Sequence, residues 1–298
     1  MAGIVESADG VALNVETDGP RDAPITVVLA HGWTLDARTW GPVTRSLTGG
    51  TPARVVRFDH RGHGRSAAVD PSTMTLEQLA DDMAAVIAAA APLGPLVLGG
   101  HSMGGMTIMA LAERHPQILE RVAGVAFVAT ASGGLAGHSM GLPPRAAAAF
   151  QAAERRMYAT PGWATRRSLG SPRLLGPGLR WLLLGACPGP EAARITIESV
   201  AACRPLTVSG FRPTLEAHER DAVLPAFAQI PTVVLVGSKD RLTPVRLSRR
   251  ILSALPSAAL SVFPGSGHML PVERVAGVAG RIGALVNGAR AGAVPAVG

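Results

Sequence analysis

Short runs of apolar residues recur along the first half of the chain, separated by segments with helical spacing of their apolar residues. The runs are Ile25 to Ala30, Ala53 to Phe58, Pro95 to Gly99 and Val122 to Ala129. Because these runs are continuously apolar, they predict strands that are buried on both faces. Thr75 to Ala91, in contrast, has the polar start and the periodicity of a helix. Strands that alternate with helices predict an α/β fold, with a mostly parallel sheet covered by helices on both faces.

This alternation stops between residues 132 and 230, where the sequence predicts helices separated by Pro/Gly breaks. It then resumes with a strand at Thr232 to Val236, a helix at about Pro244 to Leu255, a strand at Ala259 to Phe263 and a final helix at about Val272 to Val286. We therefore expect an α/β core made of residues 1–131 and 231–287, a helical cap at 132–230, and a flexible tail at 288–298.

One motif in the first half points to chemistry. Residues 100–104 read GHSMG, which matches the pattern G-x-S-x-G. A predicted strand precedes the motif and helical spacing continues from Met106 to His115, so Ser102 would lie at a strand-turn-helix corner. Gly100 and Gly104 permit a sharp turn there, which would present the Ser102 hydroxyl at the carboxyl edge of the sheet. The alternative is a Gly-rich connection in which Ser102 is an ordinary N-cap.

A serine is a nucleophile at neutral pH only when a base removes its proton and an acid orients that base. Asp240 follows the predicted strand at Thr232 to Val236, and His268 lies in the loop between the last strand and the last helix. Taken singly, Asp240 would be a turn residue and His268 a loop residue. Together with Ser102 they lie at three strand ends in the chain order Ser, Asp, His, which predicts a catalytic triad.

Acyl transfer also needs donors for the oxyanion that develops on the substrate, and each donor typically contributes about 3 kcal/mol of transition-state stabilisation. The backbone N–H of Met103, directly after the serine, is one candidate. Trp33 supplies the other candidate N–H, because it follows the first predicted parallel strand and would lie at the same sheet edge.

Five segments together resemble the signature blocks of the α/β-hydrolase fold family. They read HGW at 31–33, DHRGHGRS at 59–66, GHSMGG at 100–105, GSKD at 237–240 and GSGH at 265–268. The resemblance extends from about residue 4 to residue 287. It implies an eight-stranded sheet, the triad Ser102, Asp240 and His268, and an oxyanion hole formed by the amides of Trp33 and Met103. Segment 59–66 resembles a structural loop of the family, without a catalytic role.

The nucleophile separates the branches of this family. Dehalogenases and epoxide hydrolases use an aspartate at the corner, so Ser102 disfavours both. Serine fits esterases, lipases, thioesterases and acyltransferases, and the HGW and RGHGRS segments are also similar to non-haem perhydrolases. We expect a serine hydrolase of carboxylic esters or thioesters that needs no cofactor and no metal. An acyltransferase or perhydrolase with the same triad, and a non-catalytic ligand-binding protein on this fold, remain as alternatives.

Charge bears on possible partners. The net charge is +7, but no aromatic platform or recognition motif accompanies it, so we expect no nucleic-acid partner. Residues 145–180 contain seven arginines and only one acidic residue, Glu154. This excess is either a solvated helix face or a site for an acidic partner such as an acyl carrier protein, the phosphates of coenzyme A or an anionic membrane. We therefore expect a small acyl substrate, with a CoA-bound or carrier-bound form as an open alternative.

Several compartments and classes are disfavoured by the remaining features. The two cysteines, Cys187 and Cys203, are too few for a disulfide framework or a thiolate zinc site. No apolar run is long enough to span a bilayer and no signal peptide is recognisable, so we expect a cytoplasmic protein. Lys239 is the only lysine among 28 basic residues, which favours a GC-rich bacterial source. The sequence predicts no particular oligomeric state.

Overall fold

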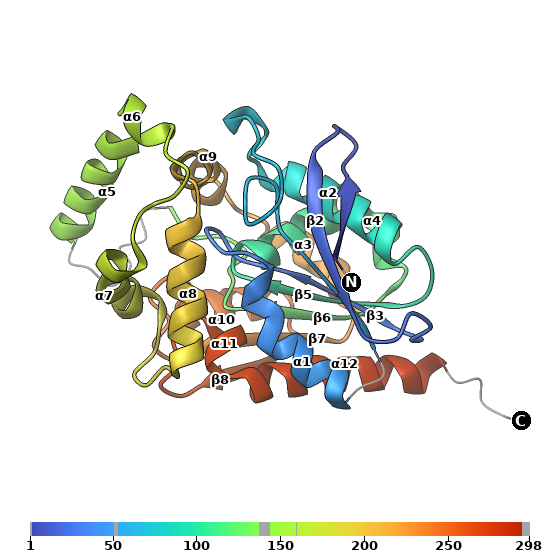
Figure 1. The fold of residues 1–298 in the computed structure, drawn as a ribbon. Helices are drawn as coiled ribbons and strands as arrows, with labels where there is room; N and C mark the ends of the chain where they lie inside the picture. The colour runs from blue at the N-terminus through green and yellow to red at the C-terminus, as the bar shows by residue number, and fades with distance from the viewer. Residues whose placement is uncertain (1, 51–52, 137–143, 159, 294–298) are drawn as a thin grey trace, which may run out of the picture.

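A computed structural model describes residues 2–50, 53–136, 144–158 and 160–293. Its centre is an eight-stranded sheet in the order β1-β2-β4-β3-β5-β6-β7-β8 (Figure 1). The strands are β1 (Ala2–Glu6), β2 (Ala12–Asp18), β3 (Thr26–Ala30), β4 (Arg54–Phe58), β5 (Leu96–His101), β6 (Val122–Val128), β7 (Thr232–Gly237) and β8 (Ala259–Phe263). All pairs from β4 to β8 are parallel, and only β1 with β2 and β2 with β4 are antiparallel. The predicted α/β fold and the eight-stranded sheet are thus confirmed.

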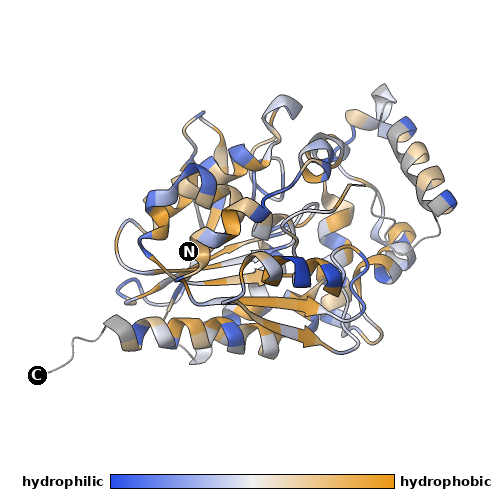
Figure 2. Ribbon diagram, turned by 180° about the vertical axis from the view of Figure 1, so that it is seen from behind, coloured by the Kyte–Doolittle hydropathy of each residue, from blue (hydrophilic) through white to orange (hydrophobic). Residues whose placement is uncertain are grey.

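Two apolar layers hold the sheet between helices. One side is covered by α1 (Gly41–Gly50) and α12 (Val275–Ala293), and the other by α2 (Leu76–Ala90), α3 (Met103–Arg114) and α10 (Val245–Ala254). Figure 2 shows the strands as hydrophobic ribbons between helices of mixed character. The predicted continuous apolar runs explain this arrangement, since β3 and β5 are buried along their whole length. The shorter elements of the core are η1 (Ala37–Trp40), η2 (Pro71–Thr73), α4 (Pro116–Leu119) and α11 (Leu270–Glu273). Just before β7, η3 (Asp221–Phe227) packs Leu224 and Phe227 into the same apolar layer as α2 and α3.

Between β6 and β7 the chain forms a helical insert, the term used here for residues 132–230. Its helices are α5 (Pro144–Tyr158), α6 (Pro161–Ala164), α7 (Pro172–Leu183), α8 (Pro190–Ala202) and α9 (Pro205–Glu216). Every one of them begins with proline, a residue that suits the first turn because its missing N–H would have no partner there. Helix α8 packs on the core through Ile195 and Val200, in one cluster with Leu35 and Met269, and α9 contributes the buried Phe211 to the main apolar layer. Helices α5 and α6 lie at the outer side of the molecule (Figure 1).

The C-terminal end differs from its prediction. The last helix was expected to stop near Val286, with a flexible tail from residue 288, but α12 continues to Ala293. Ala289 packs against the apolar layer under the sheet, and alanine and arginine in this stretch favour helix continuation. Residues 294–298 lie outside the described residues. In the part of the chain that the structure describes, no helix has the length and hydropathy needed to cross a bilayer; the cytoplasmic location stays a prediction.

Candidate functional site

The strand-turn-helix corner around Ser102 has the strained geometry that its sequence predicts. Ser102 connects β5 to α3 with φ 52° and ψ −118°, a backbone conformation that side-chain-bearing residues rarely adopt. The glycines make this corner possible. A Cβ on Gly104 would lie 2.2 Å from the Ala30 carbonyl oxygen, and one on Gly100 would lie 2.5 Å from the backbone of Gly104. The turn therefore presses α3 against the end of β3 and sets the Ser102 side chain at the carboxyl edge of the sheet.

Asp240 and His268 meet at the neighbouring strand ends. Asp240 follows β7, His268 follows β8, and Nδ1 of His268 lies 2.9 Å from Oδ2 of Asp240. Both side chains are almost fully buried. The other carboxylate oxygen of Asp240 accepts the backbone N–H groups of Leu242 and Thr243 at 2.9 and 2.8 Å. The Thr243 hydroxyl donates to Oδ2 at 2.8 Å, so the acid is held from three directions.

These contacts keep Asp240 ionised. Burial alone would raise the pKa of its carboxyl, but the adjacent His268 and the hydrogen bonds from His268 and Thr243 outweigh burial and lower the pKa below its ordinary value. A buried carboxylate in this position fixes the His268 ring with Nδ1–H toward the acid and leaves Nε2 as the acceptor.

Ser102 and His268 are linked through the residue that precedes the serine. His101 is fully buried, and its Nε2–H donates to the backbone oxygen of His268 at 2.9 Å. The two imidazole rings lie 4.9 Å apart between centroids. Among the hydrogen bonds of the described residues, none joins the side chains of Ser102 and His268; such bonds often tighten only with substrate bound.

The loop after β3 packs directly on the serine. A Cβ on Gly32 would lie 3.1 Å from Cβ of Ser102, so only glycine lets this loop approach so closely. Trp33 follows on this loop, and Met103 is the first residue of α3. In the described part of the chain neither backbone N–H donates a hydrogen bond, which leaves both amides available to an incoming oxyanion.

Three neutral histidines support this loop from below. His31 accepts the His60 N–H on Nε2 at 3.0 Å, and His63 accepts the Thr34 N–H on Nε2 at 3.2 Å. His60 in turn lies 3.1 Å from the His31 carbonyl oxygen through its own Nε2. Burial lowers the pKa of all three imidazoles, to about 3 for His63. Uncharged, they stabilise by hydrogen bonds the backbone that carries Trp33 and Thr34.

Residues 59–66 form a dense hydrogen-bonded network, as expected of a structural loop, in which the buried Nδ1 of His60 lacks a hydrogen-bond partner among the described residues. The Asp59 carboxylate accepts the backbone N–H groups of Ala37 at 2.7 Å and Arg65 at 2.9 Å. Arg61 is fully buried and makes paired hydrogen bonds to two carboxylates, those of Asp82 and Asp9. Because every charge in this loop has partners within the fold, its residues have no free charge to offer a substrate.

The insert contacts the site through its backbone. The His268 N–H donates to the carbonyl oxygen of Leu183, the last residue of α7, at 2.8 Å. This contact joins the end of an insert helix to the loop that carries the histidine. The motifs did not reveal this contact or the role of His101, because both join segments that are distant in the chain. The role of Thr243 was also missed, although Thr243 lies only three residues after Asp240.

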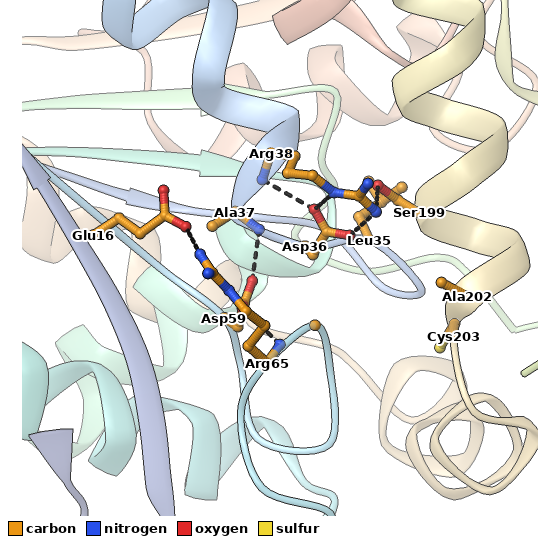
Figure 3. Close-up of a pocket in the computed structure, with 11 residues that line it drawn as sticks. Glu16, Leu35, Asp36, Ala37, Arg38, Asp59, Arg65, Ser199, Ala202 and Cys203 are labelled. Atoms are coloured by element: carbon orange, nitrogen blue, oxygen red, sulfur yellow. Dashed lines mark hydrogen bonds and ion pairs between the residues drawn. The ribbon is translucent and has the colours of Figure 1, made fainter. Parts of the chain in front are cut away.

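A separate cavity of about 430 Å³ lies between η1 and α8 (Figure 3). Its lining consists of Glu16, Leu35, Asp36, Ala37, Arg38, Asp59, Gly64, Arg65, Ser199, Ala202 and Cys203. The charged groups are paired within it, Arg38 with Asp36 and Arg65 with Glu16. None of Ser102, Asp240 and His268 lines this cavity. Its lining takes Asp59, Gly64 and Arg65 from segment 59–66, the predicted structural loop. Across the described residues, no three His, Cys, Asp or Glu side chains are grouped to hold a metal ion.

Comparison with known proteins gives a consistent family. The model of the alpha/beta hydrolase family matches residues 27–281. Among curated proteins, the pimeloyl-[acyl-carrier protein] methyl ester esterase of Aromatoleum aromaticum is 28% identical over 251 residues, 81% of this chain and 90% of the esterase. The thermophilic esterase of Thermogutta terrifontis, a solved structure, superposes with a TM-score of 0.75 at 24% identity and covers 97% of this chain and 99% of its own.

Two further relatives are more similar over shorter stretches. A bifunctional esterase/perhydrolase of Acinetobacter calcoaceticus is 39% identical over 116 residues, 38% of this chain and 40% of that protein. A probable oxidoreductase EphD of Mycobacterium tuberculosis is 37% identical over 124 residues, 41% of this chain, and the chain spans only 20% of its length. These relatives are bacterial, in line with the predicted source.

Proposed function

Because this chain belongs to the alpha/beta hydrolase family, we propose that it hydrolyses a carboxylic ester or thioester through an acyl-enzyme on Ser102. Two observations support the proposal together: the strained positive φ of Ser102 at the sheet edge, and the 2.9 Å contact between Asp240 and His268 beside it. Relatives that cover most of the chain include an esterase, which supports the same reaction class.

The proposed reaction has two halves. Nε2 of His268 takes the proton of the Ser102 hydroxyl while Oγ attacks the acyl carbon, and the carbonyl oxygen becomes an oxyanion facing the N–H groups of Trp33 and Met103. The tetrahedral species collapses, and His268 passes the proton to the departing alcohol or thiol. Water then attacks the acyl-enzyme with the same base, releasing the acid and restoring Ser102. Asp240, kept ionised, stabilises the imidazolium in both halves.

In this scheme the core, residues 1–131 and 231–287, supplies the reacting groups, and the helical insert acts as a cap that shapes the substrate site. We propose a small acyl ester as substrate. A carrier-bound ester is a further possibility for which the A. aromaticum relative, an acyl-carrier-protein ester esterase by name, gives support.

The first experiment measures turnover of p-nitrophenyl esters of increasing acyl length by the wild type and by Ser102→Ala. We expect the variant to lose at least about a thousandfold in kcat/KM, because the serine forms the covalent bond. A fluorophosphonate probe should label the wild type and spare the variant. Equal activity of both proteins would refute the nucleophile, and an unlabelled wild type without turnover would favour a non-catalytic binding protein.

Perhydrolysis is the second candidate, favoured by the A. calcoaceticus relative that is named as both esterase and perhydrolase. Here hydrogen peroxide replaces water as the acceptor, and the acyl-enzyme yields a peracid. Product analysis with peroxide added to the ester assay tests this: peracid formation that depends on Ser102 supports it, and acid as the sole product excludes it.

A further inference from the structure

One face of helix α7 carries basic and apolar side chains side by side. Leu174 is 83% exposed and Trp181 is 48% exposed, and Arg173 and Arg180 are also exposed. Each pair is separated by seven residues, close to two helical turns, so the four side chains lie along the same side of the helix. We call these four residues the α7 face.

The charge around the α7 face has one sign. From Arg155 to Pro190 the sequence contains six arginines and no acidic residue. Within the described residues, Arg173 and Arg180 form no ion pair. Their charge is therefore not compensated inside the fold, and the face is complementary to an anionic surface.

Apolar exposure is concentrated in the same region. The described part of the chain exposes six large apolar side chains, and three of them, Met157, Leu174 and Trp181, belong to the insert. An acidic protein would match the arginines, but a lipid surface matches the whole pattern. Indole rings and arginines settle at the level of lipid headgroups, while a protruding leucine enters the acyl boundary.

The α7 face is physically connected to the candidate site. Arg241 follows Asp240 directly, its guanidinium lies 4.8 Å from the centroid of the Trp181 ring, and its Nη1 donates to the Trp181 carbonyl oxygen at 2.8 Å. Two residues further on, the Leu183 carbonyl accepts the His268 N–H. An acyl ester delivered at this face would thus arrive next to the loops that carry the acid and the base.

We propose that the α7 face docks on an anionic lipid surface, from which the enzyme takes a lipid-borne acyl ester. Docking itself is independent of the chemistry, whereas the use of a lipid-borne substrate rests on the proposed function. Because Arg173 and Arg180 attract the surface electrostatically, binding should weaken as the salt concentration rises.

The test is co-sedimentation of the full chain with vesicles of phosphatidylglycerol and phosphatidylcholine, and with vesicles of phosphatidylcholine alone. We expect binding to the anionic vesicles only. Arg173→Glu/Arg180→Glu should weaken it at least about tenfold, since one basic residue near an anionic surface contributes about fivefold. Leu174→Glu should weaken it as well, because the glutamate repels the surface and cannot enter the acyl boundary.

Leu93→Glu is the matched control, because Leu93 is 84% exposed in the loop before β5, in the core and not in the insert. It should bind vesicles like the wild type, and melting temperatures should show that all variants are folded. Wild-type protein that ignores anionic vesicles, or α7 variants that bind like Leu93→Glu, would overturn the proposal. So would binding of an acidic acyl carrier protein without any vesicle binding. Vesicle binding without ester turnover would instead retain the docking face and refute the proposed function.

Discussion

The two sides of the candidate site are built in opposite ways. On the core side, the histidines under the Trp33 loop and the Arg61 network are buried; the Arg61 charge is paired, and each of these histidines makes at least one hydrogen bond. On the insert side, helix α7 exposes leucine, tryptophan and unpaired arginines. It reaches the site through two hydrogen bonds to its backbone, from the His268 N–H to Leu183 and from Arg241 to Trp181. The difference fits the two proposed tasks, in which the core holds the candidate reacting groups and the insert binds partners at the surface.

This division has a physical basis. Acyl transfer tolerates only small displacements of nucleophile, base and oxyanion donors, so the residues that hold them are locked by packing and hydrogen bonds. Substrate access demands no such precision. The insert is anchored on the core by α8, which packs against Leu35 and Met269, and by the buried Phe211 of α9, whereas α7 keeps an exposed face.

Lowering the pH should destabilise the core more than the insert, and this is the largest change in unfolding free energy that we expect. Four histidines at the site, His31, His60, His63 and His101, are fully buried with pKa values below 6.5, to about 3 for the last two. Because folding lowers the pKa of these imidazoles, the unfolded chain binds more protons than the folded protein below pH 6.5. The free energy of unfolding therefore falls as the pH drops from 6.5 toward 3. Each such histidine lowers the free energy of unfolding by up to about 1.4 kcal/mol for every pH unit of acidification in this range.

Denaturant unfolding at about pH 7.5 and about pH 5.5 measures this, and the free energy of unfolding should drop by several kcal/mol between the two. Helices α5 to α9, residues 144–216, contain no histidine, so their amide exchange should respond less. His63→Gln removes one titrating group and should flatten the pH slope by about one proton. Stability that is flat across this range would contradict the neutral histidine cluster.

Removing one buried charge should also distinguish the two regions. Arg61→Met leaves the fully buried Asp82 carboxylate without its cation, which should cost about 3–5 kcal/mol of unfolding free energy. Arg173→Met on the α7 face removes an unpaired, exposed charge and should change stability by less than about 0.5 kcal/mol. Chemical denaturation of both variants gives the comparison, and Arg61→Met/Asp82→Leu should recover part of the loss. Similar losses for Arg61 and Arg173 would show that the arginines are equivalent.

The same contrast explains what could be read from the sequence. Strands β3 to β8 were predicted within one or two residues, because short apolar runs mark them; β3 and β5 are buried along their whole length, whereas the edge strand β8 stays partly exposed. Strands β1 and β2 were implied only by the family resemblance: they lie at the antiparallel edge, and their mixed apolar and polar residues lack that signal. Asp240 and His268 were placed by the rule that parallel strands end at one edge, and the structure brings them into contact.

Contacts between distant segments carried no local signal. The hydrogen bond from His101 to His268 joins residues 167 positions apart, and the local sequence around neither residue predicts it. Thr243 was missed for another reason: it lies only three residues after Asp240, but no motif marks the hydroxyl of a threonine before a proline as a partner of that acid. Motifs therefore predict which groups react, whereas the supports of those groups become visible only in three dimensions.

Glycine substitutions should give the smallest effect and the sharpest contrast, because the same change has opposite signs in the two regions. In helix α7 a Cβ on Gly178 meets no atom within 4 Å, and alanine there should stabilise the protein by about 0.5–1 kcal/mol through better helix propensity. At the serine corner a Cβ on Gly104 would lie 2.2 Å from the Ala30 carbonyl oxygen, so Gly104→Ala must displace β3 or α3 and should cost about 1–3 kcal/mol or more. Thermal unfolding of the two variants measures both changes, and ester turnover should fall for Gly104→Ala alone. A stabilised, active Gly104→Ala would mean that β3 and α3 can accommodate a Cβ at the serine corner. Close packing at Gly104 would then not be what positions Ser102.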